Sequence, residues 1–263
     1  MHTDTRPTHH PETSPPSPGP AVRRLLISAG PTHEPIDDVR YIANRSSGRL
    51  GIELAETAAT DGWDVTLLLG PTSIEPRHST ATARHVTAPT DTTPAAGRFH
   101  VIRFRTTEDL QSLLRAHSQK ADVLIMAAAV ADYRPKTGIG GQAGAPSKIR
   151  RSDKNLILEL EPTPDLLAEC AKERKRSGKP TLIVGFALEA RDGLLEAAAS
   201  KLARKGVDLI VANPLETMDS ESIEAAILDA GGVIAETGGR IPKTEFASWL
   251  LGHLRPRLVT DEG

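Results

Sequence analysis

The sequence contains a single cysteine, Cys170, among its 263 residues. One cysteine excludes an internal disulfide framework and a cysteine-rich zinc site, and it fits a protein of the reducing cytoplasm. Because Cys170 lies in a helical pattern, we expect a small buried apolar residue there and not a nucleophile. The nine histidines show no metal-ligand spacing and give no indication of a metal site.

The sequence also lacks long hydrophobic runs and a strong net charge. No apolar stretch approaches the length of about 18 residues that spans a bilayer, so we expect no membrane partner. Residues 1–21 hold Pro, Thr, Ser and His where a signal peptide needs an apolar core, and we expect a disordered tail there. The formal net charge of −2 argues against a nucleic-acid partner, because nucleic-acid-binding domains are usually strongly basic. Any basic site must therefore be local.

Hydrophobic residues make up 38% of the sequence and charged residues 25%, which is enough to bury a sizeable core. We expect one large domain over residues 22–258, with a long irregular insertion over residues 71–97. Short β runs alternate with helical stretches, which is typical of a parallel sheet covered on both faces. The predicted fold is therefore α/β, doubly wound, with a mostly parallel, Rossmann-like sheet and short accessory β-hairpins. The predicted strands are Leu25–Ser28, Val65–Leu69, Val101–Phe104, Val123–Ala127, Leu182–Gly185 and Leu209–Ala212, and the predicted helices are Gly48–Asp61, Thr107–Ser118, Asp165–Arg176, Gly193–Lys205 and Lys243–Leu254.

Two accessory hairpins are predicted beside this sheet. The first joins Ser147–Arg151 to Leu156–Glu161, because both segments are short and alternate in polarity. The second joins Ala225–Leu228 to Val233–Glu236 about a turn that contains two glycines.

The segment from Ser28 to Gly51 joins the first predicted strand to the first predicted helix, and its residues suit anion binding. Asn44, Ser46 and Gly48 stand where the helix begins, so they offer polar side chains and unpaired backbone N–H groups. Gly48 and Gly51 let a ligand and a neighbouring strand come close to the backbone. A long loop with an ordinary serine N-cap would show the same residue types, and this alternative stays open.

Most of the polar motifs follow directly on a predicted strand. Gly30 follows the first strand, the segment ending at Asp132 follows the fourth, Phe186 the fifth and Asn213 the sixth. In doubly wound sheets, ligands gather at the carboxyl ends of the strands. The sequence therefore predicts one cleft that collects these residues.

Six segments, in this order along the chain, resemble motifs of the phosphopantothenate–cysteine ligase family. They cover much of residues 22–255, and their joint occurrence is far more specific than any one of them. The segments are Ser28–Gly51, Asp122–Tyr133, Lys148–Arg150, Pro162–Asp165, Val184–Glu189 and Asp208–Asn213. Enzymes of this family act in coenzyme A biosynthesis and use a nucleoside triphosphate to join 4′-phosphopantothenate to L-cysteine.

The resemblance implies a reaction in two steps. The substrate carboxylate would attack the α-phosphate of CTP or ATP and release pyrophosphate, and the cysteine amine would then displace the nucleoside monophosphate from the acyl-nucleotidylate. Both steps move negative charge, so the protein must supply positioning, fixed donors and cations. Mg²⁺ is expected on the phosphates, held mainly by phosphate oxygens and water. The motifs are more similar to those of bacterial members, which favours CTP over ATP. Residue types alone do not determine which base the site prefers.

The resemblance also implies roles for particular residues at the acid site. Asn44 would bind phosphopantothenate near its carboxyl group and stabilise the acyl-nucleotidylate, and Lys148 would be the catalytic lysine. Arg40 would reach the phosphate of phosphopantothenate bound by a neighbouring subunit, so a homodimer is expected. Ala128 and Ala129 would let the pantothenate arm lie close, with Asp132 as a polar contact. From its residue type alone, Asn44 could equally be a turn residue and Lys148 a solvated strand residue.

A larger set of residues is implied for the nucleotide. It combines the helix start, a turn with proline at a second helix start, a phenylalanine for the base and two lysines four residues apart. The set is Gly30, Ser46, Gly48, Gly51, Asp132, Lys148, Pro164, Asp165, Leu166, Leu167, Phe186, Lys201, Lys205 and Asn213. The lysine pair could also be an ordinary solvated helix face.

The chain departs from the family pattern in two places. Thr217–Ile223 replaces the Phe and Asn residues that follow Asn213 in many relatives, which puts nucleoside contacts there in doubt. Only the expected tail precedes residue 22, so the decarboxylase of the pathway is expected as a separate protein. Two other functions stay open: a Rossmann-type NAD(P)-dependent oxidoreductase, which the absence of Gly-x-Gly-x-x-Gly after the first strand disfavours, and a nucleotide-binding relative without catalysis.

Overall fold

A computed structural model describes residues 23–77, 98–136 and 148–258. Within these residues, eight strands form a central sheet in the spatial order β13-β12-β10-β9-β6-β1-β4-β5. These strands are β1 (Arg24–Ala29), β4 (Asp64–Leu69), β5 (Phe99–Arg103), β6 (Val123–Met126), β9 (Leu182–Glu189), β10 (Leu209–Pro214), β12 (Ala226–Asp229) and β13 (Gly232–Glu236). Six neighbouring strands, from β10 to β5, pair in parallel, whereas β12 and β13 add an antiparallel hairpin at one edge.

The order of the parallel strands confirms the predicted doubly wound fold. Numbered by their place in the chain, they lie in the order 6-5-4-1-2-3, so the direction of winding reverses between β1 and β6. Such a reversal opens a crevice outside the carboxyl ends of the two strands. The hairpin predicted at Ala225–Leu228 and Val233–Glu236 is confirmed as β12 and β13.

In the described part of the chain, five α-helices cover the two faces of the sheet. They are α1 (Arg49–Thr60), α2 (Thr107–His117), α3 (Leu166–Ser177), α4 (Leu194–Lys205) and α5 (Lys243–Leu254), joined by the short 3-10 turns η1 (Ser118–Lys120), η2 (Leu215–Thr217) and η3 (Arg255–Leu258). The apolar faces of α1 and α5 bury Ile52 and Phe246 against one side of the sheet, while α2, α3 and α4 bury residues such as Leu110 and Ala198 against the other. All five predicted helices are confirmed to within one residue at each end. None of the helices in the described ranges is both long and apolar enough to cross a bilayer.

The first predicted hairpin is wrong. Leu160–Pro162 (β8) pairs antiparallel with Tyr133–Pro135 (β7), and no strand forms over 148–151, residue 147 lying outside the described ranges. The ion pairs of Arg134 with Glu161 and of Lys136 with Glu159 hold this pairing in register. The alternating pattern identified one strand correctly, but it carries no information about a partner that lies before the 148–155 segment.

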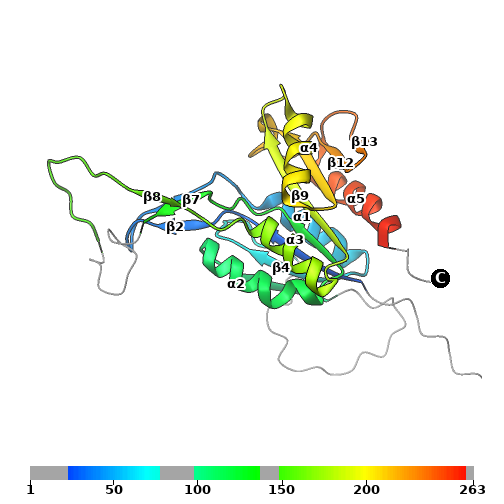
Figure 1. Cartoon of the computed structure of the whole chain (residues 1–263), viewed down its shortest axis with the longest axis horizontal. Helices are drawn as coiled ribbons and strands as arrows, with labels where there is room; N and C mark the ends of the chain where they lie inside the picture. Colours follow the sequence, from blue (N-terminus) through cyan, green and yellow to red (C-terminus); the bar gives the residue numbers. More distant parts are fainter. Residues whose placement is uncertain (1–22, 78–97, 137–147, 259–263) are drawn as a thin grey trace, which may run out of the picture.

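Short strands build an arm that extends beyond the sheet. β7 and β8 lie beside the hairpin of β2 (His33–Pro35) and β3 (Tyr41–Ala43), on the left of Figure 1. His33 and Tyr41 stack across this hairpin with their ring centroids 3.7 Å apart. A separate pair, β11 (Ser222–Ile223) and β14 (Ile241–Pro242), leads into α5. The sequence analysis did not predict β2, β3, β7, β11 or β14, because strands of two or three residues are too short to show a period.

The predicted tail, residues 1–21, lies outside the described residues, and so does part of the predicted insertion, residues 78–97. The described beginning of the insertion contacts α1 and the loop before it. Thr72 Oγ1 donates to the Ser47 carbonyl at 2.6 Å, and Arg77 pairs with Glu53 and Glu56 of α1.

A close contact between α1 and β1 gives a test of the fold. A Cβ atom at Gly51 would lie 2.4 Å from the Cβ of Ala29, so Gly51→Ala must push the first turn of α1 away from the sheet. We expect the free energy of unfolding to fall by about 1–3 kcal/mol, as measured by urea titration. The matched variant Gly252→Ala adds the same methyl group to α5, where nothing lies within 4 Å, and should stabilise the protein by about 0.5–1 kcal/mol. Equal effects of the two variants would contradict this packing.

Candidate functional site

A cleft of about 880 Å³ lies at the carboxyl ends of the strands, where the winding of the sheet reverses. Its walls come from the loop before α1, the segment after β6, the start of α3, the end of β9, the cationic face of α4 and the turn after β10. The predicted site residues that line it are Asn44, Ser46, Gly48, Gly51, Ala128, Ala129, Asp132, Pro164, Asp165, Leu166, Leu167, Phe186, Lys201, Lys205 and Asn213. Gly30, Arg40 and Lys148 are the three predicted residues that do not line it.

The first turn of α1 presents unpaired backbone N–H groups to the cleft. Gly48 occupies the N-cap position with φ +73° and has no side chain to cap the helix. Only long contacts of 3.4 Å join the N–H groups of Gly48 and Arg49 to the hydroxyls of Ser46 and Ser47. The early N–H groups of a helix lack partners within the helix and carry partial positive charge. This part of the cleft is therefore suited to an anion.

Gly30 lies in close backbone contact with this turn. It is buried, and a Cβ atom at Gly48 would come within 3.3 Å of its Cα and nitrogen. Gly30 therefore allows the loop before α1 to lie directly on the end of β1. Its predicted contact with a nucleotide stays a prediction.

The segment after β6 shapes the opposite side of the cleft. The parallel bridge between Pro31 and Ala129 continues the pairing of β1 and β6 beyond the strand ends. Asn44 Nδ2 donates to the carbonyl of Val130 at 2.9 Å, which fixes the carboxamide beside Ala128 and Ala129. The loop before α1 and the end of β6 thus meet at the residues predicted to bind the acid.

α4 contributes Lys201, Arg204 and Lys205 to the cleft. Lys201 Nζ donates to the Phe186 carbonyl at 2.6 Å, and burial lowers the pKa of this lysine, as does the neighbouring Lys205 ammonium. Lys205 pairs with Asp165 at the N-cap of α3. Although burial raises the pKa of Asp165, its hydrogen bonds from Lys205 and from the Ala168 N–H hold it below the usual value. An anion in the cleft would meet cations held in place by these contacts.

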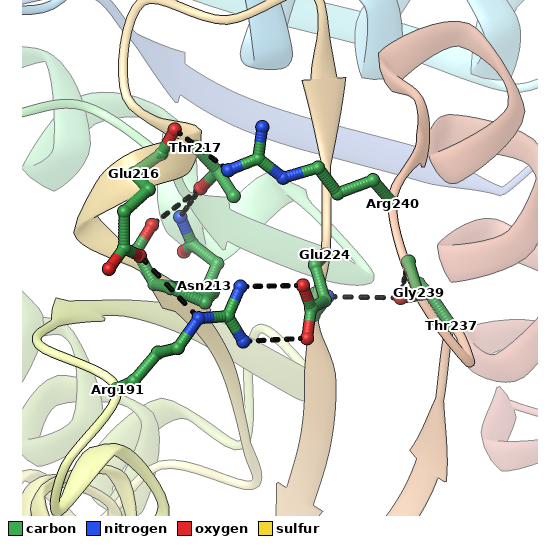
Figure 2. Close-up of polar contacts among 10 residues, drawn as sticks. Arg191, Asn213, Glu216, Thr217, Glu224, Thr237, Gly239 and Arg240 are labelled. Atoms are coloured by element: carbon green, nitrogen blue, oxygen red, sulfur yellow. Dashed lines mark hydrogen bonds and ion pairs between the residues drawn. The ribbon is translucent and has the colours of Figure 1, made fainter.

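The turn after β10 forms a further wall, shown in Figure 2. Asn213 and Thr217 are buried, and Asn213 Nδ2 donates to Thr217 Oγ1 at 2.9 Å. The Thr217 hydroxyl in turn donates to the Pro214 carbonyl at 2.7 Å. Met218, Asp219 and Ile223 also line the cleft, so the segment that departs from the family pattern still forms part of the site.

Ion pairs hold this turn against the rest of the protein. The Arg191 guanidinium donates to both carboxylate oxygens of Glu224, at 2.9 and 2.8 Å, and its Nε lies 3.9 Å from Glu216 Oε2 (Figure 2). Arg240 Nη2 donates to the Glu216 carbonyl at 3.4 Å. Two arginines from different segments therefore fix the position of η2, which carries Thr217.

Several charged residues of the cleft were missed in the sequence analysis. Lys243 is only 8% exposed and lines the cleft, as do Arg45, Arg49 and Arg204. The one sequence signal for Lys243 is its place as the first residue of a helix, where a positive charge opposes the helix dipole. Among the described residues, six cations and four carboxylates line the cleft, although the whole chain has a net charge of −2.

Arg40 and Lys148 lie together on the arm. The carboxylate of Asp37 accepts hydrogen bonds from the Arg40 side chain and from the backbone N–H groups of Val39, Arg40 and Ile149. Its hydrogen bond with Arg40 holds the pKa of the buried Asp37 carboxyl far below its usual range. Arg40 Nη2 also donates to the Ile149 carbonyl at 3.0 Å, so Asp37 and Arg40 hold the exposed Lys148 beside the β2–β3 turn.

Within the described ranges, no group of three His, Cys, Asp or Glu side chains is arranged to hold a metal ion. Cys170 is buried in α3, and burial raises the pKa of its thiol to about 12. The cysteine is therefore a packing residue, as predicted.

Comparison with known proteins finds one matching family and several similar curated proteins. Residues 21–89 and 76–256 match the family described as DNA/pantothenate metabolism flavoprotein C-terminal domain. The chain is 38% identical over 201 residues to the coenzyme A biosynthesis bifunctional protein CoaBC of Mycobacterium tuberculosis, covering 73% of this chain and 42% of that protein. It is 39% identical over 194 residues to a cysteine/cysteine sulfinic acid decarboxylase of an unknown prokaryotic organism, covering 74% and 46%.

A solved structure agrees with these matches. The crystal structure of the C-terminal domain of a CoaBC protein aligns with a TM-score of 0.67 and 30% identity, covering 91% of this chain and 97% of that chain. The chain thus spans about half the length of the curated relatives it matches and nearly all of that solved domain.

The buried pair of Asn213 and Thr217 gives a test of the far wall. Thr217→Val keeps the shape but leaves the Asn213 amide without its acceptor, so we expect a loss of about 1–3 kcal/mol in the free energy of unfolding. Thr217→Ser keeps the hydroxyl and should lose much less. The test is thermal and urea unfolding of both variants, and equal losses would show that the hydroxyl has no part in holding this wall.

Proposed function

The chain belongs to the phosphopantothenate–cysteine ligase family, within the DNA/pantothenate metabolism flavoprotein C-terminal domain family, and we propose that it joins 4′-phosphopantothenate to L-cysteine at the expense of a nucleoside triphosphate. The observation that carries this proposal is the meeting of an anion-binding helix start, a cationic helix face and the Asn44 carboxamide in one cleft. The product would serve coenzyme A biosynthesis.

The proposed chemistry follows from the low reactivity of a carboxylate. An oxygen of the phosphopantothenate carboxylate attacks the α-phosphorus, and the bond to the β-phosphate oxygen breaks with release of pyrophosphate. The cysteine amine then attacks the acyl carbon, the nucleoside monophosphate leaves with the carboxylate oxygen, and the amine loses a proton. Negative charge moves in both steps, so fixed donors and cations stabilise the transition states.

We assign the nucleotide to the side of the cleft that α1, α3 and α4 form. The ammonium groups of Lys201 and Lys205 suit the α-phosphate, and the backbone N–H groups at the start of α1 suit the phosphates beyond it. Phe186, at the end of β9, offers an apolar face for the base, and Asn213 a polar edge for the nucleoside. The preference for CTP over ATP stays an expectation from the resemblance.

Phosphopantothenate would lie along the segment after β6. The small side chains of Ala128 and Ala129 leave room for the pantothenate arm, and Asp132 offers a polar contact. Asn44, fixed by the Val130 carbonyl, would hold the carboxyl group and then the acyl-nucleotidylate. The expected Mg²⁺ would neutralise phosphate charge and be held by phosphate oxygens and water.

A homodimer would complete the site. Arg40 and Lys148 sit on the arm, outside the cleft of their own chain, and Asp37 fixes both in one place. The arm also exposes a set of large apolar side chains, each 43–80% exposed: Val39, Tyr41, Tyr133, Leu156, Ile157 and Leu160. Exposed apolar side chains gathered on one arm favour a protein interface there. The arm of one subunit would therefore bring Arg40 and Lys148 to the cleft of the other.

The activity is tested by incubating the protein with phosphopantothenate, Mg²⁺ and CTP or ATP and following pyrophosphate release with and without cysteine.

Lys148→Gln should slow the first step by about 10²–10³-fold, because it removes a cation from the developing charge. Asn44→Asp should form the acyl-nucleotidylate poorly or let it persist. Lys154→Gln, an exposed lysine close by in the sequence, is the control and should stay active. The proposal fails if the wild type releases no pyrophosphate with either nucleotide.

Mixing two inactive variants tests the shared site. Arg40→Gln damages only the arm and Asn44→Ala only the cleft, so a mixed dimer keeps one intact pair of cleft and arm. Random mixing should restore roughly a quarter of the wild-type activity, because half of the dimers are mixed and half of their sites are intact. No recovery after verified subunit exchange would place both residues in the site of one chain.

A further inference from the structure

α1 and α5 lie side by side and run in the same direction. At their carboxyl ends, Arg255 pairs with Asp61 at 2.7 Å. At their amino ends, Lys243 and Arg49 are close enough for the charge of Arg49 to lower the pKa of Lys243, and both line the cleft. Between these ends the two helices bury Ile52, Phe246 and their apolar neighbours in one core cluster. Both helix starts therefore meet at the same end of the cleft.

Neither start is capped by a side chain. The N-cap residues are Gly48 for α1 and Pro242 for α5, and neither of them makes a side-chain capping hydrogen bond. In the described part of the chain, the first turn of α1 has only the long 3.4 Å contact from the Arg49 N–H to the Ser47 hydroxyl. Two parallel helix dipoles place their positive ends here. A cation at this position is unfavourable unless an anion accompanies it.

Lys243 puts such a cation there. The residue is 8% exposed, and its ammonium group makes no ion pair and no hydrogen bond with any residue of the described ranges. Burial and the charge of Arg49 lower the pKa of Lys243, whereas Asp219 raises it. The Asp219 carboxylate is engaged with Arg45 at 3.1 Å. A buried, uncompensated ammonium group costs free energy that a bound anion would recover.

The cations of the cleft come from opposite faces of the sheet: α4 supplies one group, Lys201, Arg204 and Lys205, and the starts of α1 and α5 supply a second, Arg49 and Lys243. Lys201 is influenced by Lys205, Arg204, Glu189 and Asp132. Lys243 is influenced by a different set, Arg49 and Asp219. The first group shares its side of the cleft with Asp132, which we assign to phosphopantothenate. The second group lies at the paired helix starts.

In-line displacement separates the attacking group from the leaving group. When a carboxylate attacks the α-phosphorus, the pyrophosphate departs on the opposite side. With the acid beside Asn44 and Asp132, the leaving phosphates extend away from them. The second group lines the same cleft, and Asp132 is not among the charges that act on Lys243, whereas it is among those that act on Lys201.

On the basis of the proposed function, we infer that Lys243 is a pyrophosphate-binding residue, which holds the β- and γ-phosphates of the nucleoside triphosphate at the paired starts of α1 and α5 and retains the pyrophosphate that the first step releases. The nucleoside and the α-phosphate are held elsewhere in the cleft. Lys243 therefore contributes to the binding of CTP, ATP and pyrophosphate and not to the binding of CMP.

Isothermal titration of the full chain with CTP, inorganic pyrophosphate and CMP tests this role. Lys243→Gln should raise the Kd for CTP and for pyrophosphate by about 10- to 100-fold, as expected for the loss of a charge-assisted hydrogen bond, and should leave the Kd for CMP unchanged. Lys243→Arg should recover most of the loss. Lys120→Gln, an exposed lysine at η1 outside the cleft, removes the same charge as a control and should bind all three ligands normally.

The outcomes separate this inference from the proposed function. Normal pyrophosphate and CTP binding by Lys243→Gln would overturn the role of Lys243 alone, whereas a wild type that binds neither CTP, ATP nor pyrophosphate would overturn both. If Lys243→Gln does not fold, the wild type gives the answer through amine acetylation followed by mass spectrometry. Pyrophosphate should then protect Lys243 from acetylation and CMP should not, and a lack of protection by pyrophosphate would contradict the inference.

Discussion

The site depends on close backbone contact at the carboxyl end of β1. Gly48 lies against Gly30, Gly30 lies against Gly70, and Gly51 lies against Ala29, with hypothetical Cβ contacts of 2.4–3.3 Å. Side chains at these glycines would lift the start of α1 away from the sheet. Because the contacts are close, the free N–H groups of α1 open directly into the crevice where the winding reverses. The start of α1 is thus suited to an anion as a result of backbone packing, before any charged side chain contributes.

Charged side chains then divide the cleft. One group of cations belongs to α4, and the other gathers at the starts of α1 and α5. On the proposed function, these two groups would hold the ends of a triphosphate, which carries several negative charges, while the acid would approach from the segment after β6. Local charge placement therefore explains how a chain with a net charge of −2 can present a site for a highly charged anion.

Periodicity predicted the helices and the parallel sheet, and the strand-end motifs predicted one cleft, because residues that follow parallel strands must meet at one edge. Only the family resemblance pointed to the lysines of α4 and to the turn before α3. Both kinds of reasoning from local sequence have the same limit. They failed where partners are far apart in sequence. β8 pairs with β7 although residues 136–159 separate the two strands in the sequence. The position of Lys148 depends on the hydrogen bond that the next residue, Ile149, donates to Asp37. Lys243 was missed because a lysine at a helix start looks like a surface residue until α5 packs beside α1.

The central claim is that the acid is activated as an acyl-nucleotidylate in this cleft. The most direct test is to follow ¹⁸O from the carboxylate of labelled phosphopantothenate through one complete reaction with cysteine. The account predicts one ¹⁸O atom in the phosphate of the nucleoside monophosphate and none in pyrophosphate. Label in inorganic phosphate, or an unlabelled nucleoside monophosphate, would contradict it.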